Sequence, residues 1–373
     1  MDFSINDEQQ MLLDTTQRFL ASEYGFEQRR KLLESDRGWS PEIWSQLAEL
    51  GLLAVDIDEA DGGIGAGPVG VMLVSQAVGH GLLLEPFLSS AIVATRAITQ
   101  IGSDAQRAHW LPALASGECI AVFAHDEESA GLDLSRIKTR ATRSDAGWTV
   151  SGRKSVVYHA PMANLLLVSA RVDDGSLGLF AISANAAGVR RHELRTVDGQ
   201  RAADLEFDSV VLEADARLGQ DVSESLAAII DAGIAALCAE AFGVLDRILK
   251  ATIEYSRSRK QFGMPIGSFQ ALQHRMADML IQFEQARSMM YLATAHCRDA
   301  DALSRRAAIS GAKVLIGQAA RFIGQQAVQL HGGMGMTDEL DVSHCFKRLL
   351  AFELRLGTTD EHLAICRTNL QAA

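Results

Sequence analysis

The sequence has 373 residues, of which 48% are hydrophobic and 22% are charged, as is usual for a globular protein with a large core. It carries 35 Lys and Arg residues against 47 Asp and Glu residues, so its formal net charge is −12. Because the basic residues are scattered and outnumbered, we exclude nucleic acid as a partner.

The sequence gives no sign of export, membrane insertion or metal binding. Its start, MDFSINDEQQ, lacks the cationic and apolar segments of a secretory signal. Apolar stretches such as residues 232–245 are too short and interrupted to span a bilayer. The 5 cysteines lie far apart, and the 10 histidines show no metal-ligand spacing. We therefore expect a cytoplasmic protein with free thiols and no metal.

Residues 1–118 predict an α-helical domain. One helix is expected to start with Ser40 as N-cap and Pro41 in its first turn, and to end before Gly51. Another is expected to start after Ser103 and to break or kink at Pro112.

Residues 119–222 predict a β domain, because the apolar period changes to short runs rich in β-branched and aromatic residues. The expected strands lie within 119–125, 138–143, 147–152, 163–171, 177–183 and 202–210.

Residues 223–373 predict a helical bundle, with turns near residues 263–265, 298–301, 332–335 and 357. The order of helices, strands and helices excludes repeated βαβ units. The stretch Gly65–Gly70, GAGPVG, matches the Gly-rich fingerprint of nicotinamide-binding proteins, but four carboxylates and no strand precede it. We interpret it as a turn between helices.

The segment Ser256–His274 combines several features that suit an anionic, flat-ringed ligand. Arg259 falls in the last turn of one helix, and Ser268 is the expected N-cap of the next. The free N–H groups near Phe269 and a guanidinium could hold a phosphate, while Phe262 could pack on a ring. The alternative is that Arg259 pairs with a surface carboxylate and Phe262 is a core residue.

Two further helix ends show similar features. Gly332 and Gly333 would let a ligand approach the backbone closely. Thr358 and Glu361 have the spacing of a capping box, which exposes another helix N-terminus.

These segments resemble the flavin-binding signatures of the acyl-CoA dehydrogenase family. The resemblance rests on YSRSRKQFGMPIGSFQALQHRMADM, QAVQLHGGMGMTDE and GTTDEH, and it extends to the order of the three domains. Within the family, the sequence is most similar to the small subunit of pimeloyl-CoA dehydrogenase and to related subunits of two-component enzymes. The implied fold is α+β, with an N-terminal α-helical domain, a middle β-barrel or sandwich domain and a C-terminal four-helix bundle.

The resemblance also implies FAD as cofactor and assigns residues to it. The resemblance implies that these residues reach an FAD seated mainly in a neighbouring subunit. The implied FAD contacts are Arg259, Phe262, Phe269, Gln270, Gln329, Gly332, Gly333 and Thr358.

The sequence departs from the family at the flavin ring. Where members carry a Thr-Glu-Pro strand, this chain has His125, Asp126 and Glu127. Where members carry Trp-Ile-Thr, it has residues 156–158, Val-Val-Tyr.

The sequence also lacks a carboxylate at the positions where family members carry the catalytic base. The two positions that hold this carboxylate in family members carry Leu356 and Gly233. Glu240 is the only ionisable residue of 232–245, and a carboxylate buried there is a candidate general base. The alternative is a structural Glu240 bonded to a neighbouring helix.

Three functions follow. The first is an FAD-dependent acyl-CoA dehydrogenase that desaturates an acyl-CoA of a fatty acid or steroid side chain and passes electrons to an electron-transfer flavoprotein. It would assemble with a larger homologous subunit, or with itself as a dimer or tetramer. The second is a non-catalytic subunit that completes the FAD site of its partner. The third, an NAD-dependent dehydrogenase built on GAGPVG, is disfavoured because no βαβ unit surrounds that motif.

Overall fold

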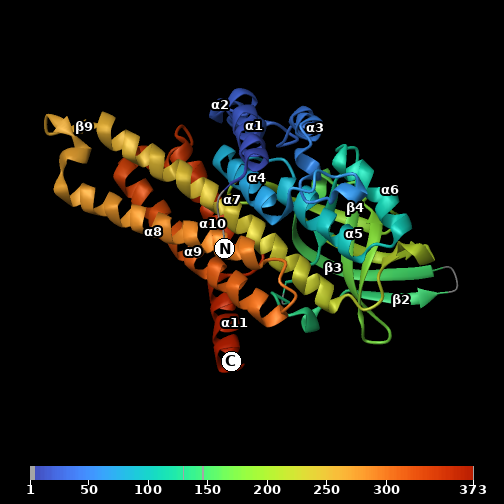
Figure 1. The fold of residues 1–373 in the computed structure, drawn as a ribbon. Helices are drawn as coiled ribbons and strands as arrows, with labels where there is room; N and C mark the ends of the chain where they lie inside the picture. Colours follow the sequence, from blue (N-terminus) through green and yellow to red (C-terminus); the bar gives the residue numbers. More distant parts are fainter. Residues whose placement is uncertain (1–4, 129, 145–146, 373) are drawn as a thin grey trace. The chain divides into compact units, whose positions relative to one another are not determined.

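The computed structural model describes residues 5–128, 130–144 and 147–372, which form two compact units (Figure 1). Unit 1 comprises Met1–Lys31, Met72–Leu83 and Ile234–Ala373. Unit 2 comprises Leu32–Val71 and Leu84–Gly233. The helices α2 (Phe26–Glu34), α4 (Gly67–Gly81) and α7 (Ser223–Ser258) contribute residues to both units.

Unit 1 is helical except for a small hairpin. Besides its parts of α2, α4 and α7, it contains α1 (Asp7–Glu23), α8 (Gln270–His296), α9 (Ala302–His331), α10 (Asp341–Leu354), α11 (Thr359–Ala372), β9 (Lys260–Gln261) and β10 (Met264–Pro265). The helix α9 packs against α8, α10 and α11, and Figure 1 shows these helices in the orange and red part of the chain. This packing forms the predicted C-terminal bundle.

Glycines let α4 and α7 approach closely within unit 1. A Cβ atom on Gly79 would collide with the carbonyl oxygen of Glu240, and one on Gly243 would collide with that of Gln76. Among the described residues, α7 alone is long and apolar enough to cross a membrane, but 89% of its most apolar window is buried in the protein. Its apolar character thus fits a core helix.

Unit 2 contains the helices whose ends were predicted most closely. In α3 (Pro41–Glu49), the Ser40 side chain accepts a hydrogen bond from the Ile43 N–H, and Gly51 follows with a left-handed φ of 73°. In α6 (Asp104–Ala115), Ser103 caps the helix as predicted. Of the two outcomes predicted at Pro112, a break is wrong, because the helix continues to Ala115, and a kink stays a prediction. Pro112 lies in the last turn, where few further hydrogen bonds depend on it.

Two buried helices precede α6 in unit 2. They are the π-helix η3 (Phe87–Ala94), which packs on β1, and α5 (Thr95–Ile101). Further upstream, Gly65 and Gly67 both have left-handed backbones. No strand precedes them in the described chain, which agrees with the rejection of a nucleotide-binding unit. The turn predicted for Gly65–Gly70 is present only at its start, because α4 begins at Gly67.

The β domain of unit 2 is one sheet with strand order β6-β7-β3-β2-β4-β5-β8, and β1 pairs in parallel with β4. Its inward-facing residues include Val122, Val168, Phe180 and Phe207, all nearly inaccessible. The strands are β1 (Ala121–Ala124), β2 (Arg140–Ser144), β3 (Gly147–Tyr158), β4 (Leu165–Val172), β5 (Leu177–Ser183), β6 (Val189–Arg195), β7 (Arg201–Leu212) and β8 (Arg217–Leu218). The element order confirms the predicted α+β class.

Candidate functional site

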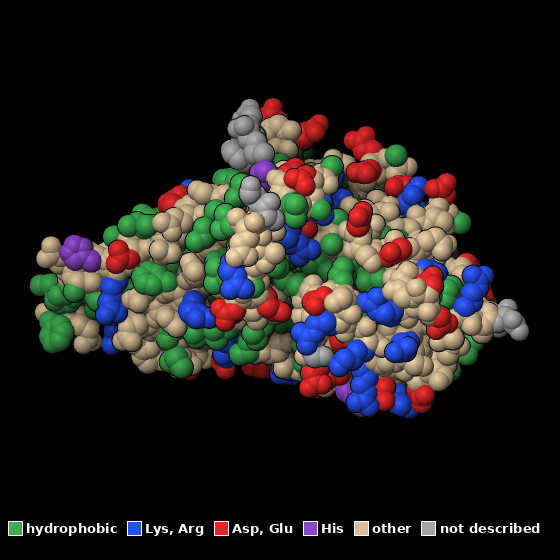
Figure 2. All heavy atoms as spheres, turned by 90° about the horizontal axis from the view of Figure 1, so that it is seen from below, with side chains coloured by type: hydrophobic (Ala, Val, Ile, Leu, Met, Phe, Trp, Pro, Cys, Tyr) green, Lys and Arg blue, Asp and Glu red, His purple; other side chains and the backbone are tan. Residues whose placement is uncertain are grey.

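The hairpin after α7 presents an aromatic ring to solvent. Phe262 and Gly263 form its turn, with φ angles of 55° and 82°, as a type I′ turn requires. Glycine tolerates this conformation, whereas a phenylalanine is strained in it. The Phe262 side chain is 89% exposed, which excludes the alternative that it is a core residue. Figure 2 shows hydrophobic side chains at the end of unit 1 where Figure 1 places β9.

Arg259 stands at the base of this hairpin on a fixed backbone. Its N–H donates to the Tyr255 carbonyl, and its own carbonyl accepts from the Ile266 N–H, both at 2.8 Å. The side chain is exposed, and within the described part of the chain its guanidinium has no ion-pair partner. The guanidinium is therefore available to an anion.

The start of α8 differs from the prediction. Ser268 does not cap the helix, because a 3-10 turn over Ile266–Ser268 moves the N-cap to Phe269, which makes no side-chain capping bond. The first N–H groups, at Gln270 and beyond, thus have no side-chain cap. Phe269 also contacts the hairpin, since its ring lies edge-on to that of Phe262 at 6.1 Å.

The end of α9 lies beside the end of α7. The rings of Tyr255 and His331 stack with centroids 4.2 Å apart, so the hairpin and the glycine turn occupy the same end of the bundle. Gly332 has φ 61° and ψ −140°, a conformation almost restricted to glycine. A Cβ atom on Gly332 or Gly333 would meet no atom within 4 Å, and Gln329 is exposed. This turn is open to a ligand.

Thr358 lies elsewhere along the bundle. The capping box predicted at α11 is present, because Glu361 accepts from the Thr358 N–H at 2.8 Å and Thr358 Oγ1 accepts from the Glu361 N–H. The next residue, Thr359, lies against Gly317 of α9, about 12 residues and so about 18 Å along the helix before Gln329. Within one chain, Thr358 and the glycine turn are therefore separate contact points.

Leu356 precedes this cap and provides no carboxylate. Its backbone is left-handed, with a φ of 53°, and its carbonyl accepts from His362 Nε2 at 3.0 Å. The buried His362 ring also contacts Ser310 Oγ at 3.1 Å through Nδ1. Burial lowers the pKa of His362 to about 4, so the ring is neutral and its Nε2–H is the donor.

The neutral His362 makes the turn before α11 sensitive to acid. The unfolded chain takes up the imidazole proton near pH 6.5, whereas the folded chain does so only near pH 4, so stability falls as the pH drops through this window. We expect His362→Gln, which keeps a donor and an acceptor, to reduce the loss of stability between pH 7 and pH 5 by about 2 kcal/mol. Urea unfolding at both pH values measures this, and an unchanged loss would contradict it.

Glu240 is buried in an ion pair within unit 1. Its Oε1 accepts from Arg348 Nη1 at 2.7 Å, and both side chains are nearly inaccessible. The second Arg348 nitrogen donates to the Leu83 carbonyl at 2.8 Å. The Glu240 backbone meanwhile packs against Gly79. These contacts favour the structural role of Glu240 over that of a general base.

A buried polar cluster in unit 2 contains His125 and Glu127, two of the residues found in place of the Thr-Glu-Pro strand. Lys154, fully buried, donates to Glu127 at 2.9 Å, to the His125 carbonyl at 3.0 Å and to Ser169 at 3.0 Å. Burial alone would raise the pKa of Glu127, but Lys154 and the hydrogen bonds from Thr139 hold it at about 2. The Glu127 carboxylate is therefore ionised and held by hydrogen bonds within this cluster.

His125 belongs to the same cluster. Burial, helped by the nearby Lys154 charge, lowers the pKa of His125 to about 3, so the ring is neutral. Its Nδ1 contacts Ser169 Oγ at 2.9 Å, and the ring stacks on Phe123 at 5.1 Å. In place of Trp-Ile-Thr, Val156 is 43% exposed and its N–H donates to Asp204.

The sequence analysis did not identify the cationic side chains that pair with Glu240 and Glu127. Arg348 lies 108 residues from Glu240, and Lys154 lies 27 residues from Glu127. The sequence indicated only that a carboxylate inside an apolar helix, such as Glu240, needs a cationic partner, and it did not indicate which residue provides the cation.

Comparison with known proteins assigns the family. The C-terminal, N-terminal and middle domains of acyl-CoA dehydrogenase match residues 227–371, 6–118 and 122–210. Acyl-CoA dehydrogenase FadE27 of Mycobacterium tuberculosis is 28% identical, over 96% of this chain and 95% of its own. FadE12 of the same organism is 31% identical, over 81% of this chain and 80% of its own.

Solved structures agree with this assignment. The crystal structure of the ChsE4–ChsE5 complex from Mycobacterium tuberculosis matches with a TM-score of 0.90 and 27% identity, over 100% of both chains. The Tcur3481–Tcur3483 steroid ACAD matches with a TM-score of 0.90 and 28% identity, over 99% of both chains. The chain therefore belongs to the acyl-CoA dehydrogenase family and is a flavin-linked acyl-CoA oxidoreductase.

Proposed function

We propose that the chain is one subunit of a hetero-oligomeric, FAD-dependent acyl-CoA dehydrogenase and that it completes the FAD site of a larger homologous subunit. The observation that carries the proposal is the contrast between its two units. The bundle keeps exposed, unpaired groups where family members contact FAD across an interface. The β domain has replaced the groups that would hold a flavin ring. Two similar structures, ChsE4–ChsE5 and Tcur3481–Tcur3483, are named as pairs of proteins.

The bundle residues fit FAD. Arg259 offers an unpaired guanidinium to the diphosphate. The uncapped start of α8 offers the N–H of Gln270, next to Phe269, whose own N–H already donates to the Ile266 carbonyl. At the same end of the bundle, Gly332 and Gly333 leave room for close approach of the ligand. Together with Phe262, Gln329 and Thr358, these are the residues that we assign to the cofactor.

Each of these residues has a binding role. Arg259 would neutralise phosphate charge, Phe262 would pack on a ring, and the left-handed turn at Gly332 would keep backbone and ligand in contact. FAD, when bound, accepts hydride from the β-carbon of the acyl thioester after a base removes the α-proton. The acyl-CoA substrate, the electron-transfer flavoprotein and a cytoplasmic location belong to the same proposal.

A second candidate function is that this subunit takes no part in the chemistry. It is favoured by the absence of a carboxylate at Leu356 and by the ion pair of Glu240 with Arg348. In this ion pair Glu240 Oε1 is held by Arg348 Nη1 at 2.7 Å, so the carboxylate is directed at a buried guanidinium. In this version the partner supplies the base.

The isolated chain is expected to retain FAD poorly. A cofactor held only by the exposed bundle contacts lacks the enclosure that a second subunit provides. Co-expression with a larger homologous subunit should therefore yield a yellow complex, whereas the chain alone should elute without flavin absorbance near 450 nm. A yellow homo-oligomer with one FAD per chain would contradict the proposal.

Arg259 is expected to contribute to FAD affinity in that complex. The change Arg259→Ala removes a charge-assisted hydrogen bond of roughly 1.5–3 kcal/mol, so the affinity should fall at least tenfold with the fold intact. Quenching of flavin fluorescence during titration measures the affinity. The control is Arg257→Ala, since Arg257 is exposed and paired with Glu254 at 3.8 Å. Equal affinity in both variants would argue against the contact.

A further inference from the structure

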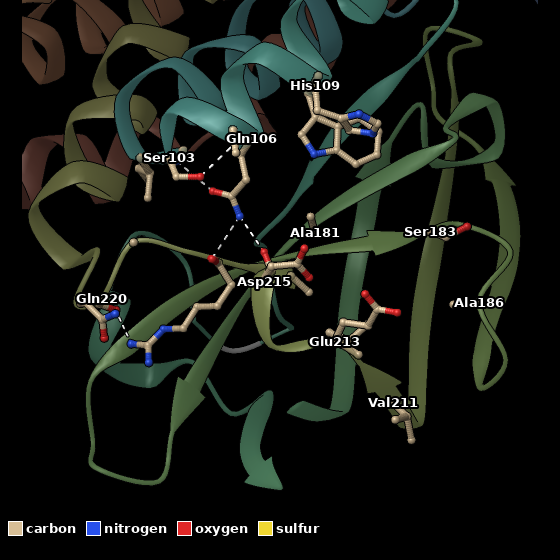
Figure 3. Close-up of a pocket in the computed structure, with 18 residues that line it drawn as sticks. Ser103, Gln106, His109, Ala181, Ser183, Ala186, Val211, Glu213, Asp215 and Gln220 are labelled. Carbon is tan, nitrogen blue, oxygen red and sulfur yellow. Dashed lines mark hydrogen bonds between the residues drawn. The ribbon is translucent and has the colours of Figure 1, made fainter. Parts of the chain in front are cut away.

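A groove of about 890 Å³ lies within unit 2, between α6 and the ends of β5 and β7 (Figure 3). Its apolar lining includes Ala105, Trp110, Ala181, Ala186 and Val211. Val211 is 68% exposed although it is a large apolar side chain at the end of a strand. None of the residues assigned to FAD line this groove, so it calls for a separate explanation.

The two walls of the groove are tied together before any ligand binds. Gln106 of α6 donates through Nε2 to the carbonyls of Asp215, at 2.7 Å, and Arg217, at 3.2 Å. The same side chain closes the capping box with Ser103, which fixes its position at the start of the helix. The groove is therefore preformed, and binding in it would require little ordering of the protein.

One wall of the groove is an unpaired strand edge. The strand β5 pairs with β4 along its whole length, from Leu177 to Ser183, but β8 covers only Leu179 and Phe180. Beyond β8, Ala181 and Ser183 line the groove, and in the described chain no strand pairs with them on that side. The Ser183 carbonyl accepts from the Ala186 N–H at 3.0 Å, so the edge is open at Ala181. Such an edge can add an extended peptide through main-chain hydrogen bonds.

The free charge in the groove is negative. Glu213 and Asp215 are exposed, and neither has an ion-pair partner among the residues described. Figure 3 shows their carboxylates between the helix that carries His109 and the strand end that carries Val211. The one cation in the lining, Arg217, is already engaged, because it lies over the Trp148 ring at 5.1 Å and donates to the Gln220 carbonyl.

We propose that this groove docks an extended segment of a partner protein that carries an arginine or lysine between apolar residues. The peptide backbone would pair with the edge of β5 at Ala181. An apolar side chain would pack on Trp110 and Val211, and the cationic side chain would meet Glu213 and Asp215. A free amine would use the carboxylates alone and leave the strand edge and the apolar wall without a function, so the three features together favour a peptide.

A labelled peptide tests the proposal directly on the complete chain. The probe is fluorescein-labelled acetyl-Thr-Val-Arg-Val-Thr, and its binding is followed by fluorescence anisotropy. One comparison peptide has Glu in place of Arg, and the other has N-methylated valines that cannot pair with a strand edge. We expect saturable binding of the Arg peptide and at least fivefold weaker binding of both comparison peptides.

Matched variants assign the binding to the groove. Glu213→Gln with Asp215→Asn should weaken the Arg peptide at least fivefold. Asp58→Asn with Glu118→Gln removes the same charge at exposed positions outside the groove and should change nothing. Glu213→Lys with Asp215→Lys should reverse the preference, so that the Glu peptide binds better than the Arg peptide.

Several results would overturn the proposal. They are absence of saturable binding, equal affinity in the groove and control variants, and equal binding of the N-methylated peptide. The last result would indicate a site for small cations. Self-association of the chain that disappears in the double lysine variant would instead assign the groove to a second copy.

Discussion

Glu240→Ala is expected to lower the free energy of unfolding by about 3–5 kcal/mol, because it removes a buried carboxylate that pairs with the buried guanidinium of Arg348 at 2.7 Å. The Arg348 side chain cannot turn to solvent easily, since its other nitrogen is held by the Leu83 carbonyl. Urea unfolding followed by circular dichroism measures the change, and an unaltered m-value would show that the unfolded state is the same.

Two comparisons separate the ion pair from simple loss of packing. Glu240→Leu with Arg348→Met removes both charges and should restore most of the lost stability, as replacement of a buried pair by apolar residues often does. Glu254→Ala removes an exposed carboxylate from the same helix, and its effect should stay within about 0.5 kcal/mol. A loss below about 1 kcal/mol for Glu240→Ala would mean that Arg348 finds another partner.

Local chemistry made the helix ends predictable. Ser40 and Pro41 act at the start of α3 and Gly51 acts just after its end, so each needs only its neighbours along the chain, and the structure places each of them as predicted. The same holds for the capping box of Thr358 and Glu361. Ser268 failed as a cap because a short 3-10 turn shifts the start of α8 by one residue, and propensity alone does not distinguish these arrangements.

Polar strands and ion pairs between residues far apart in the sequence could not be predicted from local sequence patterns. The strand β6, with sequence VRRHELR, was missed because its edge position leaves most of its side chains partly or fully exposed, so no apolar alternation marks it. The partners Arg348 and Lys154 were missed because burial of a charge is settled by the tertiary fold. Glu240 thus looked isolated in sequence, although the structure gives it a buried partner.

The base of the assembled enzyme is expected to lie in the larger subunit, at the position that matches Leu356 in this chain. Changing that carboxylate to glutamine should lower turnover by about 10²–10⁴-fold, the usual contribution of a general base, while FAD remains bound. A glutamine keeps the shape and a hydrogen bond but cannot accept the α-proton. Turnover is to be measured per assembled complex, with flavin absorbance as the measure of assembly.

Glu240→Gln is the matching variant in this chain, because Glu240 is its candidate general base. It tests whether this carboxylate, rather than one in the larger subunit, removes the α-proton. With Arg348 as its partner, Glu240 is expected to act through stability, so its glutamine variant should unfold more easily yet keep its rate per folded complex. A drop of at least 100-fold with full FAD content would make Glu240 the base after all. The two glutamine variants, assayed side by side, therefore decide which subunit removes the proton.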